Sequence, residues 1–335
     1  MVATLLHEIP LQGGDVTDGV VRVGDTVRRP ASTSTPAVHA MLRHLEAAGF
    51  DGAPRVVGMD GLGREILTYL PGTTGLRLES VSDEALAGLA LLVRRFHDAT
   101  AGFPLTMEGW EGGSNDDAEP EVIGHCDLTP DNVVFWAQAV SSSASVCASS
   151  SASAVSGSSS ASGSVSGSFS ASGSVSGSFS ASGSVSGSSS ASGSVSGSSS
   201  ASGLVSGAPA AGGGPYGMID FDLARPTTRL FDIVTTLRHW APIADPVDRA
   251  PLLRTVDVGA RLRLFCDAYG VSARERRRLL GLARLRFHRS YAVMRTRAAA
   301  GGNWAKMWAG GAGARIRRAA AWLDVHEDEL HAHLV

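Results

Sequence analysis

The chain has 335 residues, with 29 Lys and Arg against 32 Asp and Glu, and 3 Cys. The near-neutral net charge of −3 argues against a dedicated nucleic-acid-binding protein. Three scattered cysteines form neither a disulfide framework nor a cysteine zinc site. The first residues lack the pattern of a signal peptide, and no apolar run of about 18 residues predicts a membrane span. We therefore expect a cytoplasmic protein without nucleic-acid or membrane partners.

Residues 141–214 differ sharply in composition from the rest of the chain. These 74 residues carry no charge, are nearly all Ser, Gly, Ala and Val, and repeat with a period of 10 over residues 161–200. Their small apolar surface does not offset the entropy of ordering them, so we expect a disordered insert, with a Ser/Gly/Val repeat stack as the alternative. The other 261 residues suit one two-lobed domain. Its two parts have opposite charges, −11 over residues 1–140 and +8 over residues 215–335.

The N-terminal segment predicts strands behind a glycine-containing loop. Gly13 and Gly14 precede two short strands, at residues 20–23 and 26–29. Such a loop lets backbone amides approach a phosphate, although a plain hairpin loop is the alternative interpretation.

Two helices and two further strands are expected next. Apolar spacing predicts helices at residues 36–48 and 82–100, and strands at residues 54–58 and 64–70. These elements amount to a small sheet with one helix, followed by a longer helix. His97, near the end of the second helix, is expected to be a packing residue.

Residues 124–132 have a pattern that is typical of a catalytic loop. They read GHCDLTPDN and run into an apolar strand, and His-x-Asp-x4-Asn is the spacing of the kinase catalytic loop. Asp127 can orient and deprotonate an attacking hydroxyl, and Asn132 offers an oxygen ligand for Mg²⁺.

A second carboxylate for the metal is expected on the following strand. Asp220, in the segment MIDFD, lies 88 positions after Asn132, or 14 once the 74-residue insert is subtracted. A separation of this size fits a hairpin, so the insert is expected at a hairpin tip, where long insertions cost little. Asp222 is a secondary candidate.

These segments together resemble the aminoglycoside phosphotransferase-like family, which is related to choline/ethanolamine kinases and has a protein-kinase-like fold. The matching segments are GHCDLTPDNVVF, MIDFDLARPTTRLFDIV, LTYLPG and, more weakly, GGDVTDGVVRV. The resemblance implies an α+β bilobal fold. A small antiparallel-sheet N-lobe would span residues 1–70, and a mainly helical C-lobe would span 71–140 and 215–335, interrupted by the insert.

The resemblance also implies a reaction. The γ-phosphoryl group of ATP or GTP would pass, with Mg²⁺, to a hydroxyl of a small-molecule acceptor. Asp127 would be the catalytic base, and Asn132 and Asp220 would bind the metal. His125 would be a structural member of the loop, and Asp232 would brace it.

The nucleotide would lie against the N-lobe. The backbone of Thr68, Tyr69 and Leu70 would face the adenine, and the loop with Gly13 and Gly14 would lie on the phosphate side.

The sequence departs from the family at the phosphate-binding cation. The family usually places a lysine on the third strand, paired with a helix glutamate. The chain has one lysine, Lys306, so Arg28 is the natural substitute and Arg29 the runner-up. The helix position for glutamate holds Val38 or His39, and the ion pair is therefore missing or rebuilt.

The missing ion pair and the Ser-rich insert each keep another function open. One is a non-catalytic nucleotide- or metabolite-binding protein of the same fold, and the other is an interaction or tether protein that works through the insert. Cys126 stands where the family has glycine, and a left-handed backbone there would be strained.

The C-terminal part reads as helices that would build the acceptor site. Helices are expected at residues 253–269 and 272–297, the second with Ser272 and Glu275 as a capping box. Arginines cover more than one face of the second helix. They either form a solvated face that balances the acidic first part, or contact an anionic substrate or nucleic acid. Neither alternative favours a polycationic aminoglycoside.

Overall fold

The computed structural model describes residues 7–11, 19–78, 80–106, 108–111, 116, 118–136 and 214–335. Contacts divide the chain into a unit formed by residues 1–140 and 211–335 and a second unit of residues 141–210. All described residues belong to the first unit. The predictions for the Ser/Gly-rich insert and for Gly13 and Gly14 lie outside the described residues.

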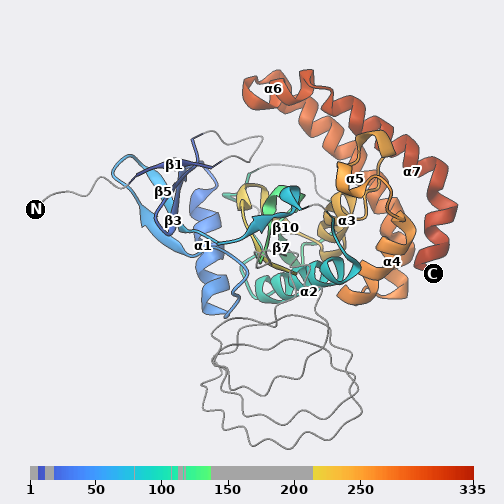
Figure 1. The fold of residues 1–335 in the computed structure, drawn as a ribbon, viewed down its shortest axis with the longest axis horizontal. Coiled ribbons are helices and arrows are strands. Elements are labelled where there is room, and N and C mark those ends of the chain that lie inside the picture. Colours follow the sequence, from blue (N-terminus) through green and yellow to red (C-terminus); the bar gives the residue numbers. More distant parts are fainter. Residues whose placement is uncertain are drawn as a thin grey trace, which may run out of the picture. The chain divides into compact units, whose positions relative to one another are not determined.

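The N-terminal part is a five-stranded antiparallel sheet in the order β1-β2-β3-β5-β4 (Figure 1). Its strands are β1 Ile9–Pro10, β2 Val21–Val23, β3 Thr26–Pro30, β4 Val56–Met59 and β5 Arg64–Thr68. Gly24, at φ 59°, lies in the tight β2–β3 turn, where a left-handed residue is needed. The central pair β3 and β5 aligns Arg28 with Ile66 and Arg29 with Glu65.

Helix α1, Thr35–Ala47, follows β3 and matches the predicted helix. Proline stands in its first turn, and Gly49 follows its end at φ 74°, where glycine avoids the strain of a left-handed backbone. Its apolar face is fully covered, and His39 is buried on the same helix.

A three-stranded sheet in the order β6-β8-β9 carries the hairpin predicted around the insert. Its strands are β6 Thr73–Thr74, β8 Val133–Phe135 and β9 Pro215–Met218, and η1 at Gly75–Arg77 follows β6. Val133 pairs with Met218, and the Trp136 amide donates to the Gly214 carbonyl at 3.4 Å. Residues 137–213 therefore connect two neighbouring positions of one antiparallel hairpin.

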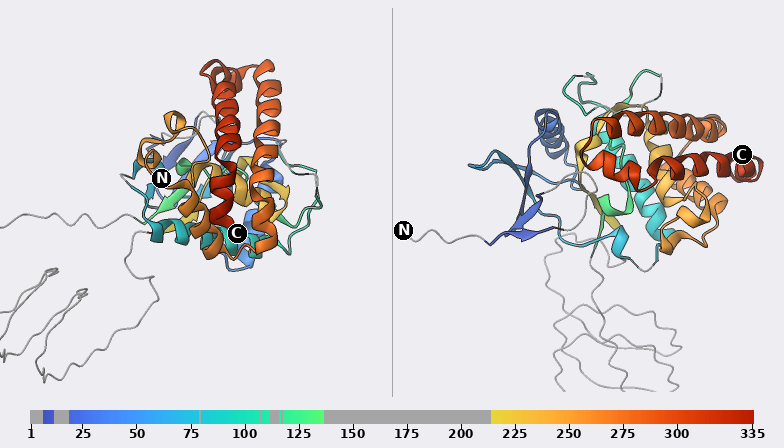
Figure 2. Two further views of the ribbon diagram at one scale, coloured as in Figure 1. Left: turned by 90° about the vertical axis from the view of Figure 1, so that its right-hand side faces the viewer. Right: turned by 90° about the horizontal axis from the view of Figure 1, so that it is seen from above.

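The rest of the C-terminal part is mainly helical (Figures 1 and 2). The helices are α2 Asp83–Thr100, α3 Arg229–Trp240, α4 Val258–Tyr269, α5 Ala273–Ala299, α6 Gly302–Ala309 and α7 Ala312–Leu334. The two long helices α5 and α7 run side by side, in orange and red in Figure 2. A two-stranded antiparallel sheet, β7 Val122–Gly124 with β10 Arg225–Thr227, lies among them. Short 3₁₀ turns complete the fold, η2 Pro130–Asn132, η3 Phe221–Leu223, η4 Pro246–Asp248 and η5 Pro251–Leu253.

Local sequence signals predict the start of one helix correctly and that of another incorrectly. Ser272 and Glu275 form the predicted capping box at the start of α5. The helix predicted at 253–269 begins later, because residues 251–253 form η5 and Asp257 caps α4 by accepting from the Ala260 amide. The α+β class is confirmed, and no described helix is long and apolar enough to cross a membrane.

Candidate active site

The loop between β7 and β8 brings Asp127 and Asn132 together. Asn132 Nδ2 donates to the Asp127 carbonyl at 2.9 Å and lies 3.3 Å from Asp127 Oδ2. Asn132 is buried, whereas Asp127 is half-buried and faces a cavity. Five positions of separation, closed by η2, therefore place an amide directly against the carboxylate.

Asp220 reaches the same place from the other strand of the hairpin. The neighbouring Ile219 amide donates to the Asn132 carbonyl at 3.0 Å. Asp220, two residues after the end of β9, has a left-handed backbone, with φ 64° and ψ 68°. Such a conformation is costly for a residue other than glycine and is concentrated at functional sites.

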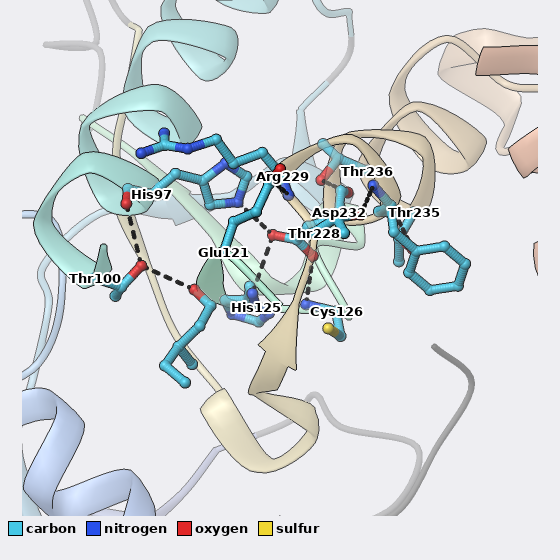
Figure 3. Close-up of polar contacts among 12 residues, drawn as sticks. His97, Thr100, Glu121, His125, Cys126, Thr228, Arg229, Asp232, Thr235 and Thr236 are labelled. Atoms are coloured by element: carbon cyan, nitrogen blue, oxygen red, sulfur yellow. Dashed lines mark hydrogen bonds and ion pairs between the residues drawn. The ribbon is translucent and has the colours of Figure 1, made fainter. Parts of the chain in front are cut away.

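Asp232 braces the loop between β7 and β8 through backbone amides (Figure 3). Its Oδ2 accepts from the His125 amide at 3.1 Å and its Oδ1 from the Cys126 amide at 2.7 Å, and the side chain is buried. Burial raises the pKa of Asp232, but hydrogen bonds and the charge of neighbouring groups outweigh it and hold the pKa below its usual value. The contact is the one that the resemblance implies for this aspartate.

Two buried histidines flank this carboxylate. His97 Nε2 lies 2.9 Å from Asp232 Oδ2, and its Nδ1 lies 2.8 Å from the Tyr269 hydroxyl. His97 thus joins α2 to the loop brace, beyond the plain packing role expected of it. His125 Nε2 donates to the Ile219 carbonyl at 3.0 Å, and burial lowers the His125 pKa, so the ring is neutral. It links the loop to the strand that carries Asp220.

Cys126 has the left-handed backbone that the sequence comparison anticipates, at φ 62°. The hydrogen bond from the Cys126 backbone amide to Asp232 stabilises this conformation. Burial raises the pKa of the Cys126 thiol to about 12, so it is a poor nucleophile at neutral pH.

Arg29, and not Arg28, points toward the aspartates. Arg29 Nη1 donates to Asp220 Oδ1 at 3.1 Å, and Nη2 contacts Asp222 Oδ2. Arg28 instead donates to Thr26 Oγ1 at 2.6 Å. The preference for Arg28 is therefore wrong in geometry, because successive strand residues face opposite sides and the runner-up faces the site.

Two cavities meet at the metal-ligand candidates. One of about 680 Å³ is lined by the sheet, Arg29 and the segment Thr68, Tyr69 and Leu70. The other, of about 310 Å³, is lined by Asp127 and by helices of the C-terminal part. Asp131, Asn132 and Asp220 line both.

The predicted adenine segment lies against the larger cavity with two of its amides already bonded. The Thr68 amide donates to the Arg55 carbonyl at 2.9 Å and the Tyr69 amide to the Asp25 carbonyl at 2.8 Å. Contacts from this segment to a base would therefore use other groups, including the side chains that line the cavity.

The donor set suits Mg²⁺. Carboxylate and amide oxygens are its preferred protein ligands, and it is commonly held by one or two carboxylates together with substrate phosphates. Asn132 and Asp220 supply such oxygens at the junction of the two cavities. Within the described residues no group of three or more His, Cys, Asp or Glu side chains forms a metal site.

Comparisons with known proteins give one sequence relative and several structural ones. No protein-family model matches the chain. A trifolitoxin immunity protein of Rhizobium leguminosarum bv. trifolii is 42% identical over 132 residues, 38% of this chain and 50% of that protein. The chain thus spans about half the length of this curated relative.

The solved structures of similar fold include a kinase family protein and two aminoglycoside phosphotransferases. A choline/ethanolamine kinase family protein from Mesorhizobium loti has a TM-score of 0.47 at 15% identity, over 97% of this chain and 92% of that one. The GDP complex of aminoglycoside 2′-phosphotransferase-IIIa has a TM-score of 0.44 at 13% identity, over 97% and 92%. An aminoglycoside phosphotransferase from Streptomyces rimosus has a TM-score of 0.41 at 14% identity, over 83% and 92%. These groups are the ones that the sequence motifs resemble.

Proposed function

We propose that the protein is a small-molecule phosphotransferase that moves the γ-phosphoryl group of ATP or GTP to a hydroxyl, with Mg²⁺. The observation that carries this proposal is the meeting of two cavities at Asn132 and Asp220, with Asp127 on the smaller one. A nucleotide in the larger cavity and an acceptor in the smaller one would present their reacting groups to each other at this junction.

Each residue then has a defined task. Asp127 Oδ accepts the proton of the acceptor hydroxyl as its oxygen bonds to the γ-phosphorus, and the bond from that phosphorus to the bridging oxygen breaks, releasing the nucleoside diphosphate. Asn132 holds Asp127 in place through the hydrogen bond to its carbonyl. Asn132 and Asp220 would hold Mg²⁺, which neutralises phosphate charge when bound. Arg29 would contact phosphate oxygens.

Arg29 also weighs against the non-catalytic alternative, which the absence of a lysine–glutamate pair favours. Its Nε lies 3.2 Å from Glu65 Oε1, and His39 on α1 contacts the same carboxylate at 2.8 Å. A cation, an acid and a helix residue are thus still connected, with the acid supplied by β5.

An acceptor screen tests the proposed reaction. Release of ADP or GDP is followed with small hydroxyl compounds, in parallel for wild type and Asp127→Asn. We expect at least one compound to raise nucleotide turnover in wild type and not in the variant. Nucleotide binding without turnover for any acceptor would favour the non-catalytic alternative.

A second candidate role is protection against a toxin, and the 42% identity to a trifolitoxin immunity protein favours it. The two roles are compatible, because a phosphotransferase can inactivate a hydroxyl-bearing toxin. Growth of toxin-sensitive cells that express wild type or Asp127→Asn tests this role. Protection by wild type alone would join immunity to the chemistry, and no protection by either would reject the role.

A further inference from the structure

The smaller cavity, beside Asp127, is lined by five arginines from four elements. They are Arg225 of β10, Arg238 of α3, Arg286 and Arg297 of α5, and Arg315 of α7. The acidic residues that line the same cavity are Asp127, Asp131 and Asp220, at the end where phosphoryl transfer is proposed. The C-terminal wall of the cavity is therefore cationic.

The arginines of α5 divide between two faces. Arg284 is half-buried and pairs with Asp324 at 2.8 Å and Glu327 at 2.7 Å on α7. Arg276 pairs with Asp267 at 2.7 Å. Arg286 and Arg297, by contrast, line the cavity. The charge balance expected between this helix and the acidic first part of the chain is found at Arg297, whose Nη2 lies 2.9 Å from Glu111 Oε1. Arg276 and Arg284 pair with acids of the C-terminal part instead.

Two of the cavity arginines are deeply buried. Arg286 is 9% exposed and Arg225 is 6% exposed. Arg286 Nε donates to the neutral Thr235 hydroxyl at 3.0 Å, and Arg225 Nε is buried with no hydrogen-bond partner. Burying a guanidinium without an anionic partner is costly, and a bound anion would offset that cost.

The pKa values of Arg286 and His239 respond to the same positive charge. Burial, reinforced by the charge of Arg238, lowers the pKa of Arg286 to about 9, although Asp127 opposes the shift. Burial also holds the pKa of His239 well below its usual range, with Arg238 and Arg286 adding to the effect. His239 is therefore neutral, and the positive charge in this cavity comes from the arginines.

Guanidinium groups recognise oxyanions, because their planar N–H donors match carboxylate and phosphate oxygens in pairs. We propose that the acceptor carries a carboxylate or phosphate group, which Arg225 and Arg286 bind while its hydroxyl reaches Asp127. This inference rests on the proposed phosphotransferase function and specifies its substrate class. A polycationic acceptor would meet the five arginines unfavourably.

Binding of simple anions tests the inference without any turnover. The probes are inorganic phosphate and glycerate, with choline chloride at the same ionic strength as reference, followed by thermal shift and calorimetry on the full chain. We expect phosphate or glycerate to bind and choline not to bind. Which of the two anions binds more tightly distinguishes a phosphate from a carboxylate acceptor.

Variants assign the binding to this cavity. Arg286→Met is expected to weaken the preferred anion about tenfold to a hundredfold, as for the loss of a charged hydrogen-bond partner. Arg315→Gln, at an exposed position on α7, is a second variant that spares the core. Arg284→Gln, at a position of α5 that pairs with α7, is the matched control and should bind as wild type does.

The outcomes separate this inference from the proposed function. It is overturned if neither anion binds, if both cavity variants bind like wild type, or if only Arg29→Met abolishes binding, because the anion would then lie in the larger cavity. Turnover with cationic or neutral acceptors alone would also overturn it, while leaving the phosphotransferase intact. Anion binding that is lost in Arg286→Met, in a protein that does not bind nucleotide, would instead reject the proposed function.

Discussion

Arg29 of β3 and Glu65 of β5 form a buried ion pair, with 3.2 Å between Nε and Oε1 and with the side chains 9% and 4% exposed. The Nε–H makes no hydrogen bond, so the contact is one of charge. Glu65 is held from its other side by His39 of α1 at 2.8 Å. The carboxylate that pairs with Arg29 therefore comes from a neighbouring strand, whereas the resemblance implies one from a helix.

Replacing Arg29 should destabilise the protein. Arg29→Met leaves Glu65 as a buried carboxylate without its arginine, and we expect the free energy of unfolding to fall by about 3 kcal/mol. Urea unfolding measures this change. Arg28→Met is the matched control on the adjacent residue and should change the free energy by less than about 0.5 kcal/mol. Equal losses in the two variants would contradict the assignment of Arg29 to the buried pair.

Replacing Asp127 should affect turnover and spare nucleotide binding. Asp127→Asn removes the proton acceptor but keeps the shape of the side chain, so we expect kcat to fall by about 10² to 10⁴. Steady-state kinetics with the acceptor found by the screen gives kcat, and calorimetry gives the nucleotide Kd. Asp51→Asn, at an exposed position in an earlier part of the chain, is the control. Unchanged kcat in Asp127→Asn would remove it as the base.

Asp232 should govern stability in acid. Its pKa in the folded protein lies below the usual value, so the charged form favours folding at neutral pH, and this contribution is lost as the pH falls below about 4. The asparagine of Asp232→Asn does not titrate. We expect the free energy of unfolding of this variant at pH 7 to be about 3 kcal/mol lower than that of wild type, because the hydrogen bonds from the backbone amides of His125 and Cys126 weaken.

Unfolding curves at several pH values check this assignment. The difference in free energy of unfolding between wild type and Asp232→Asn should narrow as the pH falls from 5 to the lowest value at which both still fold. A difference that stays constant with pH would show that the charge of Asp232 contributes nothing to the brace.

The insert should be dispensable for folding. Trp136 and Gly214 are hydrogen-bonded neighbours, so the 77 residues between them can be replaced by a linker of five Gly and Ser residues. Shortening the loop by four halvings should raise the free energy of unfolding by about 2 kcal/mol if it closes freely. Circular dichroism and thermal unfolding follow the result. Loss of soluble protein on replacement would show that the insert supports the fold.

The sequence predicts this site where the signal is local. The spacing of Asp127 and Asn132 and the capping box of α5 each lie within a few residues, and the structure places them accordingly. Subtracting the insert also predicts the hairpin that brings Asp220 to Asn132.

The misplaced details depend on tertiary register. The alternation of side chains along a strand predicts that Arg28 and Arg29 lie on opposite faces of the sheet. Which of the two faces is turned toward the site depends on how β3 pairs with β5. Glu65 reads as an ordinary surface residue of a strand until that pairing buries it against Arg29. Likewise, only the packing of α5 against α3 and α7 shows that Arg286 faces a cavity and Arg284 an acidic neighbour.

We propose that Asn132 and Asp220 lie where a metal-bound nucleotide meets its acceptor. Calorimetric titration of ATP and GTP into wild type and Asp220→Asn, each with and without Mg²⁺, tests it most directly. We expect wild type to bind at least one of the two nucleotides more tightly with Mg²⁺, and this gain to be lost in the variant. Absence of binding of both nucleotides to wild type, or an equal Mg²⁺ gain in Asp220→Asn, would contradict it.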